Sequence, residues 1–226
     1  MIAKENYRFL RNLDDFRLLP IDQFDELALH IKKRKVPKEH ILFFEGDVRD
    51  KLYIVVSGYV RIEHSDTFGT FTYTDFITSH NIFPYEGLFE DEVYRFSAQA
   101  MTDVEYFCVP TKLFEEFSAT SVYQMKHLYV GLSRLLRLHE LRVRNVVTSS
   151  ASMRVEQSLA FLLKELGEVD SHLPIALTTS DVAAISGTTR ETVSRVFRDL
   201  KKKHLIAIDH KYIVFLDRDY FLKFLR

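Results

Sequence analysis

Short apolar and aromatic segments separated by turn residues dominate the chain from about residue 36 to residue 110. Five of them have the length and β-branched content of strands: residues 41–44, 52–56, 59–63, 68–74 and 104–109. Turns such as Glu45-Gly46-Asp47 lie between them. Many short strands at this spacing predict an antiparallel sandwich or barrel. The preceding residues 9–33 carry an imperfect apolar stripe, which predicts mostly helix.

After Pro110 the apolar spacing becomes helical. Residues 121–147 contain no proline, and their apolar positions form one stripe along a helix of about seven turns. The stripe consists of Met125, Leu128, Leu132, Leu135, Leu136, His139 and Val143. Because the other faces carry charged side chains such as Arg134 and Arg137, this helix is not expected to be buried all round. The pattern predicts packing against a copy of itself, with packing along its own domain as the alternative.

Residues 177–200 contain two helix starts in close succession. Thr178 with Asp181, and Thr188 with Glu191, each fit the capping box, in which a hydroxyl and an acidic side chain satisfy the first backbone amides of a helix. Gly187 between the two helices suits a left-handed turn position. A short helix, a tight turn and a second helix make a helix-turn-helix. The polar residues 148–152 upstream predict a hinge.

The second helix of this pair has an inward apolar face and an outward polar face. Val193, Val196, Phe197 and Leu200 recur at helical spacing and are expected to point inward. The outward set is Glu191, Ser194, Arg195 and Arg198, with Arg190 in the first turn. Arginine can donate two hydrogen bonds to guanine, and glutamate can accept one from cytosine. This face therefore predicts reading of DNA bases, against the plainer alternative of a solvated face with an Arg–Glu pair.

Hydroxyl and lysine side chains around this helix suit phosphate oxygens. Thr188 and Thr189 lie at its start, and Thr178, at the start of the first helix, joins the predicted DNA-contacting set. Two short strands, residues 205–209 and 212–216, predict a wing with Lys211 near its tip. The charge agrees with an anionic partner: residues 176–226 carry a net +4 and residues 1–175 a net −5.

Composition excludes several classes of protein. With 46% hydrophobic and 28% charged residues, the 226-residue chain is neither disordered nor of low complexity. No apolar run approaches the roughly 18 residues of a membrane helix, and the charged N-terminus has no signal-peptide block. The single cysteine, Cys108, excludes a disulfide framework and a zinc finger. We expect a soluble cytoplasmic protein with no membrane partner.

Three motifs resemble the Crp/Fnr family of bacterial transcription regulators over nearly the whole chain. Residues 41–47 and 52–62 are similar to the family's β-roll, and the long helix lies where the family has its dimer helix. Residues 187–195 (GTTRETVSR) are similar to its recognition helix almost residue for residue. The resemblance implies that Arg190, Glu191 and Arg195 read bases. It also implies an inverted repeat of half-sites with a TGA core, bound by a two-fold homodimer.

The resemblance also implies a fold class and a division of the chain. The fold class is α+β, with an N-terminal antiparallel, jelly-roll-like β-roll, a long dimerisation helix and a C-terminal winged helix-turn-helix. The expected parts are residues 1–117 as the effector or sensor domain, 118–148 as the dimerisation helix and hinge, and 149–226 as the DNA-binding domain. The expected partners are double-stranded DNA, a second copy of the chain and, for an activator, RNA polymerase.

The effector region departs from the pattern of family members that bind cyclic AMP. Those members have a Gly-Glu-x-Gly stretch and a later Arg-Ser or Arg-Thr pair, whereas this chain has Pro84-Tyr85-Glu86-Gly87 and Arg95-Phe96. Proline removes an amide donor, and Tyr85 replaces the ribose-binding carboxylate. The candidate effector pocket is therefore Tyr85, Glu86, Gly87, Arg95 and Phe96 with an unnamed small-molecule effector other than cyclic AMP. One cysteine is too few for the family's iron–sulfur branch.

An alternative class is a metal-dependent enzyme on a cupin-like barrel. Such an enzyme needs a cluster of ligands, but His64 and His80 are the only histidines in the later strand region and form no His-x-His pattern. No nucleophile elbow or phosphate-binding glycine loop is present. We therefore expect no catalytic residues, no metal site, no cofactor and no enzymatic activity.

Overall fold

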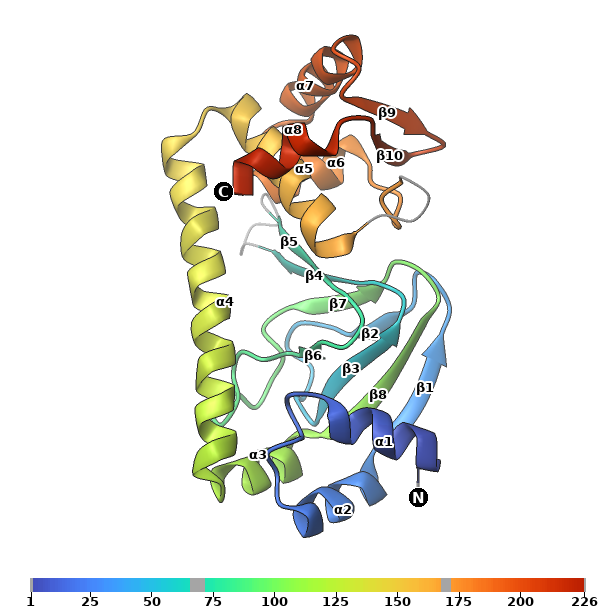
Figure 1. The fold of residues 1–226 in the computed structure, drawn as a ribbon, viewed down its shortest axis with the longest axis vertical. Coiled ribbons are helices and arrows are strands. Elements are labelled where there is room, and N and C mark those ends of the chain that lie inside the picture. Colours follow the sequence, from blue (N-terminus) through green and yellow to red (C-terminus); the bar gives the residue numbers. More distant parts are fainter. Residues whose placement is uncertain (1, 66–71, 168–171, 226) are drawn as a thin grey trace. The chain divides into compact units, whose positions relative to one another are not determined.

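The computed structural model describes residues 2–65, 72–167 and 172–225 (Figure 1). They form two compact units, each continuous in space but not in sequence. The first contains Met1–Ile62 and Ile77–His139, and the second contains Glu63–Phe76 and Glu140–Arg226. The chain passes between the units at the hairpin of β4 (Val60–Ser65) and β5 (Thr72–Ile77), and again within the helix α4 (Val122–Thr148).

Two four-stranded antiparallel sheets form the expected β-roll. One has the order β1-β8-β3-β6 and consists of β1 (Lys32–Val36), β8 (Val104–Pro110), β3 (Lys51–Ser57) and β6 (Ile82–Phe83). The other has the order β2-β7-β4-β5 and adds β2 (Ile41–Phe43) and β7 (Ser97–Ala100). Part of the strand expected at residues 68–74 lies outside the described residues.

The sheet that contains β3 and β8 is covered on both faces. Alternate residues point to opposite faces of a strand, so Tyr53 and Tyr106 join the cluster inside the roll, whereas Ile54 and Phe107 join a second cluster. That second cluster is completed by apolar residues of α1 (Lys4–Asn12), α2 (Ile21–His30) and α3 (Thr111–Ala119). Burial of both faces explains why residues 52–56 are apolar without alternation.

The sequence pattern missed β1, which is Lys-Lys-Arg-Lys-Val. The expectation of helix for residues 9–33 is wrong at Lys32 and Lys33, which pair with Cys108 and Phe107 of β8. This strand lies at the edge of its sheet, and its register comes from β8 rather than from an apolar face of its own. Lysine and arginine are common on edge strands because they discourage pairing with another chain.

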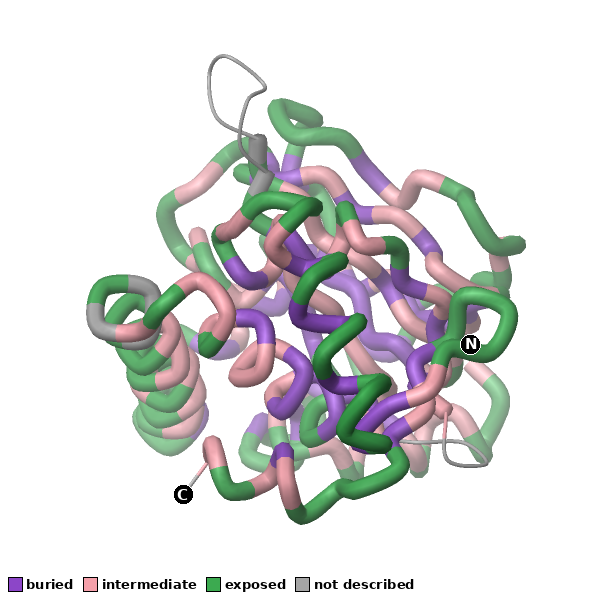
Figure 2. Tube along the Cα trace, turned by 90° about the horizontal axis from the view of Figure 1, so that it is seen from above, coloured by how far each residue is buried: buried purple, intermediate pink, exposed green. Residues whose placement is uncertain are grey.

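The long helix α4 is confirmed, and it is mostly uncovered within this chain. Figure 2, in which α4 is seen nearly end-on at the left, shows exposed and intermediate positions around it. Among its described positions only Gln124 and Leu128 are buried. Leu128 lies in this chain's own core cluster, whereas Leu132, Leu136 and Val143 are 47%, 58% and 63% exposed.

The second unit contains a three-helix core and a β-hairpin. The helices are α5 (Ala151–Leu166), α6 (Thr179–Ser186) and α7 (Arg190–Lys202), followed by β9 (Ile206–Asp209), β10 (Tyr212–Phe215), α8 (Arg218–Leu222) and the 3-10 turn η1 (Lys223–Leu225). Val155 and Leu159 of α5, with Val193 of α7, are fully buried. The expected helix-turn-helix and wing are therefore present.

Candidate nucleic-acid interface

The turn between α6 and α7 has the expected backbone. Gly187 is left-handed, with φ 56° and ψ 45°, a conformation that glycine adopts without a Cβ clash. Its N–H and that of Thr188 donate to the carbonyls of Ala184 and Ala183, which closes the end of α6. At the start of α6 the capping box is complete: Thr178 Oγ1 accepts from Asp181 N at 3.2 Å, and Asp181 Oδ2 accepts from Thr178 N at 2.6 Å. The Thr178 hydroxyl also donates to Asp181.

The cap of α7 lies one residue later than expected. Thr189, not Thr188, is the N-cap, and its Oγ1 accepts from Thr192 N at 3.3 Å. The predicted box of Thr188 with Glu191 is therefore wrong, because the helix begins at Arg190. Glu191 instead accepts hydrogen bonds from its own backbone N–H and from Thr189, and these lower the pKa of its carboxyl.

The inward and outward faces of α7 are as the sequence predicts. Val193, Val196, Phe197 and Leu200 are buried. Arg190, Glu191, Ser194 and Arg195 are exposed on the other face. Arg195 makes one long hydrogen bond, 3.4 Å from Nη2 to the Ser152 hydroxyl of α5. The structure therefore brings together Arg190, Glu191 and Arg195, the three residues predicted to read bases, with Ser194 on the same face, and leaves their side chains exposed.

The wing is attached beside the start of α6. The turn residues His210 and Lys211 both have positive φ, 45° and 85°, which makes a tight two-residue hairpin. The Lys211 carbonyl accepts from Leu177 N at 3.2 Å, directly before Thr178. This bond holds the wing turn near the first residue of the helix-turn-helix, so Lys211 and Thr178 belong to one surface region. Both side chains are exposed.

The five residues predicted for an effector pocket lie in different surroundings. Phe96 is 6% exposed in the cluster inside the roll, and Tyr85 packs against the other cluster. Arg95 is 65% exposed and makes a two-point ion pair with Asp91, whose pKa this bond lowers. Glu86 is exposed. Gly87 has a φ of 77°, and a Cβ on it would collide with the Asp91 side chain.

Tyr85 is directed at the long helix. Its hydroxyl donates to Asp15 Oδ1 at 3.2 Å, and a Cβ on Gly131 of α4 would lie only 2.8 Å from its Oη. Gln124 of α4 donates to the Asp15 carbonyl at 2.6 Å, and His127 lies 3.6 Å from the Asp15 carboxylate. Burial raises the pKa of Asp15, and His127 opposes that shift. Tyr85 thus lies against α4.

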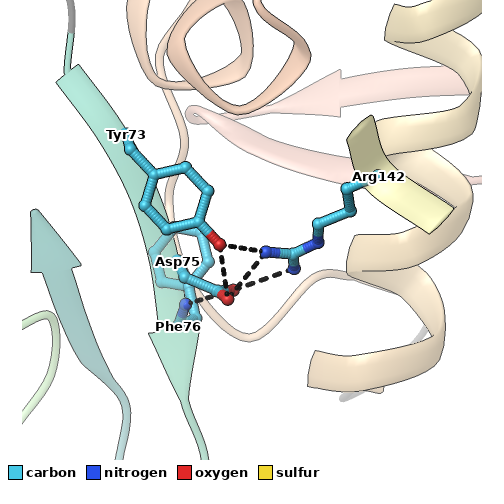
Figure 3. Close-up of polar contacts among 4 residues, drawn as sticks. All are labelled: Tyr73, Asp75, Phe76 and Arg142. Carbon is cyan, nitrogen blue, oxygen red and sulfur yellow. Dashed lines mark hydrogen bonds and ion pairs between the residues drawn. The ribbon is translucent and has the colours of Figure 1, made fainter. Parts of the chain in front are cut away.

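A second contact to α4 involves residues that the sequence did not indicate. Arg142 donates from Nη1 to Asp75 Oδ2 at 2.7 Å, from Nη2 to Asp75 Oδ1 at 3.1 Å, and from Nη1 to the Tyr73 hydroxyl at 2.5 Å (Figure 3). The guanidinium also lies 4.0 Å above the ring of Phe161 in α5. Burial by itself would lower the pKa of Arg142, but the bonds to Asp75 raise it. No spacing rule links residues 67 positions apart, so sequence reasoning had no signal for this cluster.

Two further observations concern metal sites and membrane-spanning helices. Within the part of the chain that the structure describes, His, Cys, Asp and Glu form no group of three or more that could hold a metal ion. None of the helices in residues 2–65, 72–167 and 172–225 combines the length and apolarity that a membrane span requires.

Two family models match this chain, one mainly within the first unit and one within the second. Residues 33–121 match the family described as cyclic nucleotide-binding domain, and residues 154–224 match the Crp-like helix-turn-helix domain. The chain is 28% identical over 212 residues to the anaerobic regulatory protein of Bacillus subtilis (strain 168), which covers 91% of this chain and 89% of that protein. It is 26% identical over 189 residues to the cAMP-activated global transcriptional regulator CRP of Pasteurella multocida, with 82% and 90% covered. Among solved structures, FixK2 from Bradyrhizobium japonicum superposes with a TM-score of 0.73 at 21% identity, covering 86% of this chain and 96% of that chain.

We predict that Asp75→Asn destabilises the second unit by roughly 1–3 kcal/mol, because it leaves the half-buried Arg142 guanidinium without a carboxylate. The matched control is Glu105→Gln, which breaks an exposed pair with Lys33 and should cost no more than about 1 kcal/mol. Urea unfolding of Asp75→Asn, Arg142→Gln and the double variant measures the coupling. Additive effects of the two substitutions would contradict a direct interaction.

Proposed function

The chain belongs to the Crp/Fnr family of bacterial DNA-binding transcription regulators, and from this premise we propose that it acts as a homodimer that reads an inverted repeat with TGA-containing half-sites. The observation that carries the proposal is the outward face of α7. Two arginines, a glutamate and a serine are exposed there, on a helix whose other face is buried. This arrangement suits insertion into the major groove, where base edges present donors and acceptors.

The roles of the residues follow from their chemistry. Arg190 and Arg195 would each donate two hydrogen bonds to a guanine, and Glu191 would accept one from a cytosine. A glutamate carboxyl is ionised near neutral pH even at its ordinary pKa, so Glu191 can accept this bond. Ser194 lies between them on the same face. Thr188, Thr189 and Lys211 would bind phosphate oxygens, and Thr178 would contribute from the start of α6.

The homodimer is supported by the uncovered apolar positions of α4. Leu132, Leu136 and Val143 recur along one stripe and are about half exposed or more, and Met125 is 37% exposed on the same stripe. A row of exposed apolar side chains on one helix is typical of a surface that another protein covers. A second α4 is the simplest partner, because it brings the same stripe in two-fold symmetry and matches the symmetry of an inverted repeat.

We propose that the regulating signal is something other than cyclic AMP. The relative from Pasteurella multocida is cAMP-activated by name, but this chain differs at the residues that would receive the nucleotide. Tyr85 contacts Asp15 and the Gly131 region of α4, and Arg95 is paired with Asp91. A phosphate would have to displace a carboxylate that already binds the guanidinium at two points, and the phenol cannot replace a ribose-binding carboxylate.

Each of the three expected parts of the chain has its own role in this proposal. Residues 1–117 would sense the signal, residues 118–148 would form the dimer and hinge, and residues 149–226 would bind DNA. A signal can shift the placement of α7 only by having different affinity for two states of the dimer. If the protein activates transcription, a contact with RNA polymerase would follow. The relatives that it matches are transcription regulators, and no observation favours an enzyme.

Arg195→Ala should weaken binding to the operator by about 1–3 kcal/mol and relax the preference at one base pair, because it removes a base contact. Fluorescence anisotropy with duplexes that vary one position at a time measures both effects. Lys201→Ala, an exposed cation in the last turn of the same helix, is the control. It should weaken all duplexes equally, and equal loss on all duplexes with Arg195→Ala would refute the reading role.

Leu132→Glu should convert the dimer into a monomer, because it buries a carboxylate in the proposed seam. Leu141→Glu is the matched control. Leu141 lies nine residues after Leu132 on α4 and therefore on the opposite side of the helix. The two side chains are similarly exposed, Leu141 to 37% and Leu132 to 47%. Sedimentation velocity compares them with the wild type. A monomeric wild type, or a Leu132→Glu dimer as tight as the wild type, would contradict the proposed seam.

Calorimetric titration of the purified protein with cyclic AMP should detect no binding in the micromolar range. The reason is that Arg95 is engaged by Asp91 and the ribose carboxylate is replaced by Tyr85. Saturable heat at micromolar ligand, with a stoichiometry of one per chain, would overturn this part of the proposal.

A further inference from the structure

Arg154, in the first turn of α5, joins three segments of the second unit. Its Nε donates to the Ser186 carbonyl at 3.0 Å, its Nη2 to the Gly187 carbonyl at 2.8 Å, and its Nη1 to the Ser149 carbonyl at 3.2 Å. Ser186 is the last residue of α6, Gly187 is the turn residue, and Ser149 directly follows α4. One side chain therefore binds the end of the long helix and the turn of the helix-turn-helix at the same time.

The bonds from Arg154 satisfy carbonyl groups at the C-terminal end of α6. The last carbonyls of a helix have no partner within it and carry partial negative charge. The last turn of α6 contains no basic residue of its own, and the amides of Gly187 and Thr188 satisfy only Ala184 and Ala183. Arg154 supplies the positive charge from another helix. Because a guanidinium is a rigid planar fork, two bonds to consecutive carbonyls also set the direction of the turn.

The direction of the turn sets where α7 begins. Gly187 is two residues before Thr189, the N-cap of α7, and three before Arg190. A change in the turn would move Arg190, Glu191 and Arg195 together. Among the described residues, the side-chain hydrogen bond of Arg195 outside its own helix is a long one, 3.4 Å to Ser152, which does little to hold it. α5 is further tied to α4 by Arg142, which lies over the ring of Phe161.

We propose that Arg154 is a positioning residue for DNA reading. It holds α7 in a fixed position relative to the end of α4, so that a movement of the end of α4 also moves the outward face of α7. The inference rests on the proposed DNA-binding function. Arg154 is not itself a base or phosphate contact in this role, and its effect on DNA is exerted through the turn. Two other roles make different predictions: a direct phosphate contact, and a purely structural support whose loss lowers stability alone.

The test uses the full chain and a duplex that the wild type selects from random sequences, with a scrambled duplex as reference. The variants are Arg154→Gln and Arg154→Lys, with Lys164→Gln as the control that removes the same charge from an exposed position of the same helix. Anisotropy titrations at several salt concentrations give the affinity for each duplex and the salt dependence. Circular dichroism at the assay temperature establishes that each variant is folded.

Arg154→Gln should lower the preference for the selected duplex over the scramble by about tenfold or more, with the affinity for the scramble and the salt slope unchanged. Arg154→Lys should fall between Arg154→Gln and the wild type, because an ammonium can bind some of the three carbonyls but lacks the fork. Lys164→Gln should match the wild type. In the free protein, amide exchange at Thr188 and Thr189 should be faster in both Arg154 variants.

The outcomes separate the possibilities. A wild type without preference for any duplex would overturn the proposed function and this inference with it. A discriminating wild type with an equally discriminating Arg154→Gln would overturn the inference alone. A salt slope reduced by about one unit would instead identify Arg154 as a phosphate contact. If Arg154→Gln does not fold, Arg154→Lys decides: an undiminished preference with unchanged exchange at Thr188 would also overturn it.

Discussion

The continuous backbone hydrogen bonding of α4 is the constraint on which the organisation of the chain depends. The helix runs unbroken from Val122 to Thr148, yet its residues up to His139 belong to one compact unit and those from Glu140 to the other. Each part is fastened to its own unit by polar contacts rather than by a broad apolar face. Gln124 and His127 meet Asp15 in the first unit, and Arg142 meets Asp75 in the second. Leu132, Leu136 and Val143 of the apolar stripe are thereby left about half exposed or more, whereas Leu128 is buried in the first unit.

Polar side chains of this chain are hydrogen bonded by other residues of the same chain at places where the family resemblance leads one to expect a ligand. Arg95 binds Asp91, and Tyr85 binds Asp15. In both cases the polar group is already hydrogen bonded, so a ligand would have to replace an existing bond instead of filling an unmet one. The outward arginines of α7 differ in kind, because they lie on an exposed face, and the hydrogen bond of Arg195 is a long one to the neutral Ser152 hydroxyl.

The predictions that succeeded depend on short stretches of sequence. The turn at Gly187 and the buried face of α7 were predicted from residues within one or two helical turns of each other, and the structure has them. The failures have two kinds of cause. β1 has no apolar face of its own and is a strand because the distant β8 pairs with it. The cap of α7 is a local error, because two adjacent threonines could serve and the helix uses Thr189. The Arg154 fork and the Asp75–Arg142 pair join residues more than 30 positions apart.

The sequence by itself determined the secondary structure of the helix-turn-helix and wing, the single stripe of α4 and the outward chemistry of α7. These follow from helical spacing, capping side chains and the backbone freedom of glycine, which are properties of neighbouring residues. Only the tertiary structure decided that Phe96 is part of the core, that Tyr85 contacts α4, and that Arg154 holds the turn. The physical reason is that hydrogen-bond partners and packing neighbours are selected by the folded path of the chain, and spacing along the sequence carries no record of that choice.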